Sequence, residues 1–242
     1  MAKIFATTSG KGGVGKSSVA VGLGFAFSGL GHRVLLVDMD EALRCLDLLL
    51  GVEGEAVLDL SDAVDSKDIF DVAYNCGRDN LYLIPAPTQK GEIVPDALSR
   101  FCERAAGAFD IIIFDFPAGV DFTLYAALPL STLFLAVATP DPVSVRDAAV
   151  VSGRLEQMNL KSRLIINRFD CKSLFKRGHK NIDGIIDSTA IRLLGIIPES
   201  AELSLLSVKN TLKRNGKTNK AFLRIAGRLL NNNITLPKIK SI

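Results

Sequence analysis

A glycine-rich segment near the N-terminus has the residue types that bind phosphate groups: Gly10-Lys11-Gly12-Gly13-Val14-Gly15-Lys16-Ser17-Ser18. It matches the pattern G-x-x-x-x-G-K-[ST], in which glycines let backbone N–H groups curl around phosphate oxygens. Lys16 would neutralise charge on the β- and γ-phosphates, and the Ser17 hydroxyl would bind Mg²⁺. The sequence therefore predicts a nucleotide site in this segment, with a strand before it and a helix after it.

A second lysine, Lys11, is not required by the pattern, because Lys16 already supplies the cation. Lys11 comes too early in the segment to fold easily onto phosphates held by its own loop. It is better placed to reach a nucleotide held by a neighbouring subunit. Lys11 therefore suggests a site shared between two copies of the chain.

Acidic residues end two apolar runs, Val34–Asp38 and Ile111–Asp115. Asp38 and Asp40 are two residues apart, and alternate residues of an extended chain point to the same face. In sheets of parallel strands, ligands bind beyond the carboxyl ends of the strands. We therefore expect Asp38, Asp40 and Asp115 at the edge of a sheet where a ligand binds.

Short β-branched or aliphatic runs alternate with longer helical stretches along the chain. The expected strands are Ile4–Thr7, Val34–Asp38, Leu81–Ile84, Ile111–Asp115, Leu133–Ala138, Leu164–Asn167 and Leu194–Ile197. The expected helices include Ser17–Ser28, Asp96–Ala108, Val143–Met158 and Lys220–Leu230. This alternation predicts an α/β fold, with a mostly parallel twisted sheet of about seven or eight strands and helices on both faces.

The composition is that of a folded globular protein, with 48% hydrophobic and 23% charged residues among 242. We expect a single domain over residues 1–230 and a short basic tail over residues 231–242. The longest apolar runs are far too short to span a membrane, and the N-terminus lacks the features of a secretory signal. We therefore expect a cytoplasmic protein.

Basic residues are concentrated at the C-terminal end of the chain. Residues 203–242 contain no Asp or Glu and nine basic residues: Lys209, Lys213, Arg214, Lys217, Lys220, Arg224, Arg228, Lys238 and Lys240. This asymmetry indicates either an anionic partner, such as DNA or an anionic membrane, or simply a solvated helix and tail.

The segment KGGVGKSS at residues 11–18 resembles the deviant phosphate loop of MinD/ParA-type ATPases. Further segments resemble the MinD branch of that family: VDMDEALRCLDLLLG at 37–51, FDFPAG at 114–119, TPDPVSVRDA at 139–148, INRF at 166–169 and FKRGHKNIDGIIDSTAIRLLGIIPES at 175–200. The resemblance covers roughly residues 3–200. It implies the P-loop NTPase fold of MinD, ParA and the nitrogenase iron protein.

The resemblance also implies an ATPase that uses Mg²⁺ and hydrolyses ATP slowly, under stimulation by a partner protein. It assigns Asp40 to orienting the attacking water, Asp115 to holding Mg²⁺ through water, and Asp38 to the surroundings of the ion. Lys11 would contact phosphates across the interface of an ATP-bound homodimer, as an arginine finger does.

For the base, the resemblance implies that Asn167 hydrogen-bonds adenine, with Arg168 and the turn Ile197-Pro198-Glu199 on either side. Nucleotide state would then set the oligomer. Loss of the γ-phosphate would release two switch segments, residues 40–50 and 115–121.

The resemblance leaves open which process the ATPase serves. A MinD-type protein would cycle at the inner face of the cell membrane and regulate division-site or flagellar placement. A ParA-like partition protein would bind DNA through residues 203–242. The membrane-binding terminal helix of MinD proteins is not expected here, because Asn231–Asn233 and Pro237 oppose a helix.

Two other functions on the same fold are disfavoured. An iron–sulfur carrier would need paired cysteines, whereas Cys45, Cys76, Cys102 and Cys171 are scattered. A regulator that no longer hydrolyses ATP would not need the full set of charged residues that this chain has: Lys11, Lys16, Asp38, Asp40 and Asp115.

Overall fold

The structure is a computed structural model that describes residues 2–41, 43–88, 93–119, 121–170, 181–206 and 211–237. Some residues considered above lie outside the described residues: Ala42 and Val120 of the switch segments, Cys171, residues 175–180, Lys209, Lys238 and Lys240.

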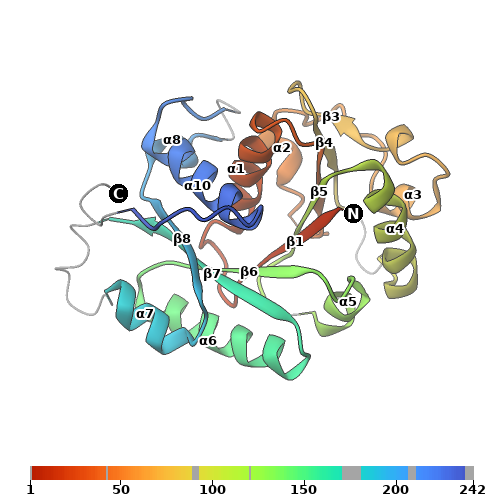
Figure 1. Ribbon diagram of the computed structural model, residues 1–242. Helices are drawn as coiled ribbons and strands as arrows, with labels where there is room; N and C mark the ends of the chain where they lie inside the picture. The colour runs from red at the N-terminus through yellow and green to blue at the C-terminus, as the bar shows by residue number, and fades with distance from the viewer. Residues whose placement is uncertain are drawn as a thin grey trace.

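The described strands form one eight-stranded sheet in the order β3-β4-β2-β5-β1-β6-β7-β8 (Figure 1). Their bounds are Lys3–Thr8 (β1), Val34–Asp38 (β2), Tyr74–Asn75 (β3), Leu81–Ile84 (β4), Ile111–Asp115 (β5), Leu133–Ala138 (β6), Lys161–Phe169 (β7) and Leu193–Pro198 (β8). All neighbouring pairs are parallel except β3 with β4. The predicted α/β sheet is confirmed. The short edge strand β3 was not expected.

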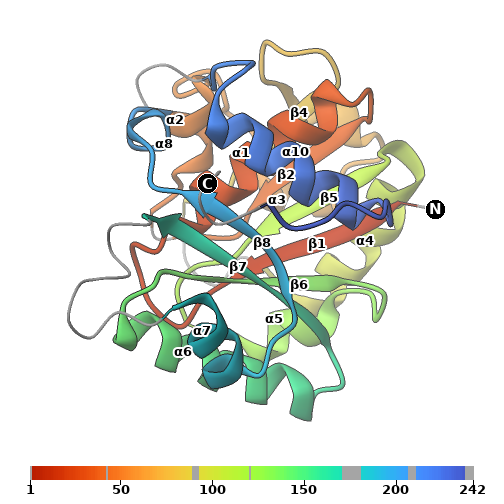
Figure 2. The same cartoon turned by 60° about the vertical axis from the view of Figure 1, so that its left-hand side comes forward.

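Helices cover both faces of the sheet (Figures 1 and 2). Their bounds are Lys16–Gly29 (α1), Leu46–Leu50 (α2), Leu60–Asp65 (α3), Pro95–Ala108 (α4), Phe122–Ala127 (α5), Pro142–Gln157 (α6), Ile182–Thr189 (α7), Ala201–Ser204 (α8) and Lys217–Leu229 (α10), with a 3₁₀ turn at Ile69–Asp71. Within the described residues, none of these helices is long and apolar enough to cross a membrane.

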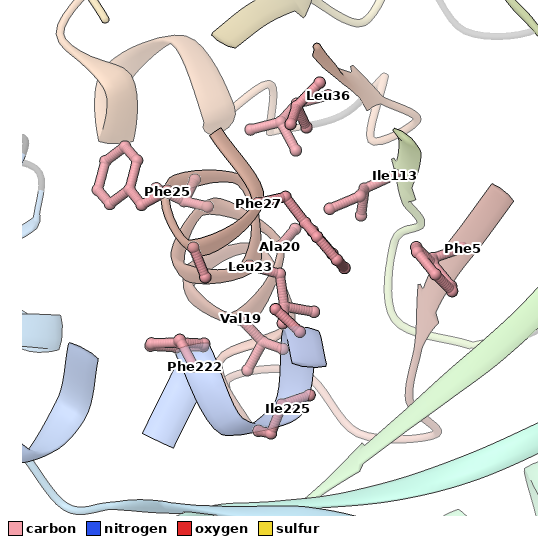
Figure 3. Close-up of a cluster of buried hydrophobic side chains, with 14 of the residues drawn as sticks. Phe5, Val19, Ala20, Leu23, Phe25, Phe27, Leu36, Ile113, Phe222 and Ile225 are labelled. Carbon is pink, nitrogen blue, oxygen red and sulfur yellow. The ribbon is translucent and has the colours of Figure 1, made fainter. Parts of the chain in front are cut away.

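Helix α1 is the central helix of one face, because it is packed between the sheet and α10 (Figure 3). Its residues Val19–Phe27 are all buried, so both sides of the helix contact protein. A Cβ on Gly22 would lie 2.3 Å from Cζ of Phe222 on α10. Glycine therefore lets the two helices approach closely, and this packing fixes the helix that follows the phosphate loop.

Candidate nucleotide-binding site

The glycine-rich loop joins the end of β1 to the start of α1. Gly13 and Gly15 have φ angles of 77° and 90°, in the left-handed region that glycine adopts without a steric penalty. No side chain caps the N-terminus of α1. Its first N–H groups and the positive end of its dipole are thus directed toward the loop, where an anion would bind.

Lys16 is the first residue of α1, and it is 8% exposed. Burial lowers the pKa of its amine, and the charges of Asp115 and Asp40 oppose that shift. A buried ammonium needs anionic partners. Lys16 therefore lies between two acidic residues, Asp40 and Asp115, and the position expected for the phosphates.

Asp115 ends β5 directly beside the loop, because Thr7 of β1 and Asp115 are paired in register. Its Oδ1 accepts a hydrogen bond from Oγ1 of Thr7 at 2.5 Å, and its side chain is also hydrogen-bonded to Ser17. Burial raises the pKa of the Asp115 carboxyl, which is 1% exposed. The sequence did not single out Thr7, which orients this carboxylate.

Asp38 lies beside Asp115, because β2 and β5 pair these two residues in register. Burial, followed by the charge of Asp115, raises the pKa of Asp38 to about 7. The backbone N–H groups of Asp40 and Leu46 donate to its two oxygens, at 2.9 and 3.0 Å. Like charges side by side in a sheet repel. Two neighbouring buried carboxylates are therefore a donor set suited to a divalent cation.

Asp40 lies just beyond the end of β2 and is partly exposed. Its backbone carbonyl accepts a hydrogen bond from the N–H of Arg44, which holds the following segment in a turn. Its charge acts on both Lys16 and Asp38. The structure therefore brings Asp40 close to the other acidic residues, as expected for residues at the ends of adjacent strands.

Cys45 is a residue of this site that the sequence did not single out. Its Sγ lies 3.3 Å from Oγ of Ser17. Burial raises the pKa of the Cys45 thiol to about 11, so the thiol is neutral near pH 7. Cys45 precedes α2, so its contact with Ser17 joins the segment that follows β2 to the phosphate loop.

Lys11 contacts a different part of the molecule. Its Nζ lies 3.3 Å from Oδ1 of Asp141, and its side chain is 43% exposed. Asp141 is the N-cap of α6 and also accepts hydrogen bonds from Thr139 and from the backbone N–H of Ser144. Lys11 is thus held by α6 and is accessible to solvent, whereas Lys16 is buried.

Asn167 lies on β7 beside the phosphate loop and is 1% exposed. Its Nδ2 donates to the carbonyl of Val14 at 2.8 Å, whereas its Oδ1 is buried without a partner among the described residues. A small pocket here is lined by Gly15, Ser18, Asn167, Arg168, Glu199, Ser200, Leu203 and Ser204. Pro198 lines a separate pocket with Lys217, Lys220 and Pro237.

The profile of the CobQ/CobB/MinD/ParA nucleotide binding domain matches residues 5–214. The chain belongs to this family. The septum site-determining protein MinD of Bacillus subtilis is 34% identical, with 98% of this chain and 92% of that protein covered. The resemblance expected from the motifs is therefore confirmed.

Solved structures of MinD proteins share the fold. The MinC:MinD cell division protein complex of Aquifex aeolicus matches with a TM-score of 0.86 and 29% identity, covering 98% of this chain and 99% of that chain. MinD of Pyrococcus horikoshii, complexed with Mg-ADP, matches with a TM-score of 0.81 and 26% identity, covering 95% and 96%. The P-loop fold of the CobQ/CobB/MinD/ParA family is thus present along nearly the whole chain.

Two features of this family member fit a bound nucleotide with Mg²⁺. The unpartnered Oδ1 of Asn167 is a buried acceptor beside the loop, and burying an acceptor without a donor costs about 1–3 kcal/mol. The carboxylates of Asp38 and Asp115 are paired in register. Lys16 is the one cation among the groups that shift the pKa of Asp115, and no cation is among those that shift the pKa of Asp38. An N–H group of a nucleotide base would donate to Oδ1 of Asn167, and a metal ion would neutralise the two carboxylates.

Proposed function

We propose that this chain is a MinD-like ATPase. It dimerises on binding Mg-ATP, hydrolyses it slowly and so cycles on and off a cellular surface, regulating division-site placement or a similar positioning process. The observation that carries this proposal is the convergence of Lys16, Ser17, Asp38 and Asp115 at the loop between β1 and α1. We further propose residues 1–230 as one P-loop ATPase domain, with residues 231–242 as its tail.

The residues of the site have distinct roles in this proposal. Backbone N–H groups of residues 10–18 and the amine of Lys16 hold the phosphates. Ser17, Asp38 and Asp115 hold Mg²⁺, which when bound stabilises charge on the phosphates. Asp40, the more exposed carboxylate, orients the water that attacks the γ-phosphate. Asn167 receives the amino group of adenine on its Oδ1, with Arg168 and Pro198 nearby.

Lys11 acts across the dimer interface. Its support is the contrast between the two lysines of the loop: Lys16 is buried among the acidic residues, and Lys11 is exposed and paired with Asp141. An amine on the outside of the loop is accessible to a second copy of the chain. There it would stabilise charge on the phosphates, as an arginine finger does.

A further protein takes part in the cycle as an effector or stimulating partner. The support is the similarity to the MinD chain of the Aquifex aeolicus MinC:MinD complex. In this proposal the protein is in the cytoplasm or peripheral at the inner face of the cell membrane.

The second candidate is a ParA-like partition or flagellar-number-regulating ATPase. The observation that favours it is α10, in which Lys217, Lys220 and Arg224 form a helical stripe and no residue is acidic. Such a stripe suits DNA phosphates as well as anionic lipid. Pull-downs with DNA and with anionic liposomes, each in Mg-ATP, separate the two candidates. Binding to neither contradicts both.

Light scattering tests the central proposal. We expect a dimer with Mg-ATP or a slowly hydrolysed analogue and a monomer with Mg-ADP. Lys11→Ala is expected to bind ATP, remain monomeric and lose hydrolysis. Lys67→Ala, which removes another exposed lysine, serves as the control. A wild-type protein that stays monomeric with the analogue at every concentration contradicts the proposal, as does a Lys11→Ala variant that dimerises normally.

A further inference from the structure

A further cavity, of about 500 Å³, lies at the amino ends of β6 and β8, whereas the phosphate loop lies at the carboxyl end of β1. It is bordered by the first residues of β6 and β8, by β7 near its start, and by the end of α10 with the residues that follow it. Three arginines line it: Arg163, Arg192 and Arg228.

The strand alternation places one of these arginines, Arg163, on the face of the sheet that α10 covers. Leu164 of β7 pairs with Leu193 of β8, and both pack in the cluster formed with α6 and α7. Successive residues of a strand alternate between faces. Arg163, which precedes Leu164 on β7, therefore faces the other side, where α10 lies. Arg192 lies just before β8 and lines the same cavity. Because both arginines line the cavity, an anion bound there would lie near two positive charges.

The third arginine is held in place by the tail. All three nitrogens of the Arg228 guanidinium donate to backbone carbonyls at 2.6–2.8 Å. Nε donates to Ile234, Nη1 donates to Leu194, and Nη2 donates to Thr235. The tail turns back at the end of α10 and runs along the helix (Figure 2). A Cβ on Gly227 would lie 2.2 Å from Cδ1 of Ile234, so glycine allows this close packing. The Arg228 guanidinium is thus fixed by neutral carbonyls, which do not cancel its charge.

No acidic residue neutralises these charges within the described part of the chain. The rest of the cavity lining is aliphatic or asparagine, without a carboxylate. None of the ion pairs formed by the described residues includes Arg163, Arg192 or Arg228. Arg163 and Arg228 are half-buried and Arg192 is exposed, and all three charges would attract an anion that enters the cavity.

The lining specifies the class of anion. Guanidinium groups match phosphate oxygens in charge and in bidentate geometry. Leu133 and Leu229 give the same cavity an apolar wall. We propose that this cavity binds a ligand with a phosphate group joined to an apolar body, the phosphate lying against Arg163 and Arg192. This site is separate from the nucleotide site and does not depend on the proposed ATPase function.

Calorimetric titration with hexyl phosphate tests this site in the full chain. We expect binding to the wild type, weaker binding of inorganic phosphate, which lacks the apolar body, and no binding of hexanol, which lacks the charge. In Arg163→Gln/Arg192→Gln, the affinity for hexyl phosphate should fall at least about tenfold, with Mg-ATP affinity unchanged. Lys67→Gln/Arg100→Gln removes two exposed positive charges elsewhere and should retain wild-type affinity.

The proposal is overturned if the wild type does not bind hexyl phosphate, or if both double variants bind it as tightly as the wild type does. Sedimentation with vesicles identifies the source of the phosphate. Phosphatidylglycerol vesicles that bind the wild type better than Arg163→Gln/Arg192→Gln, with phosphatidylcholine vesicles as the control, indicate a lipid headgroup. Equal sedimentation of both proteins, alongside the loss of hexyl phosphate binding, indicates a soluble phosphate ester.

Discussion

The amine of Lys11 lies 3.3 Å from a carboxylate oxygen of Asp141, so one chain holds the exposed lysine of its own phosphate loop at the N-terminus of α6. If Lys11 acts on a nucleotide of a second copy, this ion pair must break when the dimer forms. Asp141 is thus a competitor for the amine within the same chain.

We expect Asp141→Asn to favour the ATP-bound dimer by about two- to fivefold, because a half-exposed ion pair contributes only up to about 1 kcal/mol. Asparagine is as good an N-cap as aspartate, so α6 should be retained. The dimer dissociation constant with a slowly hydrolysed ATP analogue, measured by sedimentation, checks this. Asp59→Asn, a matched change at the N-cap of α3, is the control. A weaker dimer in Asp141→Asn would show that the pair assists association.

The unpartnered Oδ1 of Asn167 predicts selectivity for adenine. Wild-type protein should bind ATP about tenfold more tightly than purine riboside triphosphate, which lacks the amino group, because one buried hydrogen bond is lost. In Asn167→Ala the two nucleotides should bind equally, though both more weakly, since the bond to the Val14 carbonyl is also removed. Competition titrations measure this. Undiminished discrimination in Asn167→Ala would place adenine recognition elsewhere.

The raised pKa of Asp38 predicts a pH dependence of Mg-ATP binding. With a pKa of about 7 in the free protein, this carboxyl is largely protonated below neutral pH and must lose its proton to hold a cation. Affinity for Mg-ATP should therefore increase from about pH 6 to about pH 8, with proton release near pH 7. Calorimetry in two buffers of different ionisation enthalpy counts the protons. The Asp38→Asn variant should release fewer protons than the wild type when Mg-ATP binds. An unchanged number of released protons would show that Asp38 is not the group that titrates.

The same pKa shift has a consequence for stability. An acidic group that binds its proton more tightly in the folded than in the unfolded state destabilises the fold as pH rises between the two pKa values. Nucleotide-free protein should therefore lose stability from about pH 4 to about pH 7, other groups being equal. Melting temperatures measured across this pH range, with and without Mg-ATP, check this. A bound cation stabilises the ionised carboxylate, so the loss of stability with rising pH should disappear when Mg-ATP is bound. A loss of equal size with Mg-ATP bound would contradict it.

Close packing of α1 against α10 predicts that Gly22→Ala is destabilising. The added Cβ would lie 2.3 Å from the ring of Phe222, and overpacking of this kind costs about 1–3 kcal/mol. Gly29→Ala, at the other end of the same helix, has open space around its Cβ and should be neutral or stabilising. Denaturant unfolding compares the two. Equal stability of the two variants would show that Phe222 moves aside without a penalty (Figure 3).

The long regular elements were predictable because their apolar patterns are strong. The seven expected strands and the four expected helices are present, with ends that differ by a few residues. The short helices α2, α3, α5 and α8 were not expected, because four to six residues are too few to show a helical period. Strand β3 is two residues long and depends on β4 for its pairing.

The candidate site divides in the same way. Local chemistry identified the phosphate loop and the acidic residues at strand ends, since residue type and spacing carry that information. Thr7 and Cys45 were missed, because a hydroxyl and a thiol have no distinctive spacing, and their importance comes from neighbours distant in the sequence. Asp141 lies within the segment TPDPVSVRDA, but no local pattern indicated its ion pair with Lys11.

The order of residues along the chain thus determined the fold class, the phosphate loop and the membership of an ATPase family, because each depends on local spacing. The pairing of Asp38 with Asp115, the ion pair of Lys11 with Asp141 and the cavity of three arginines were decided only by the tertiary structure. Each of these joins residues far apart in sequence. Their distances follow from strand order and helix packing, which no local pattern encodes.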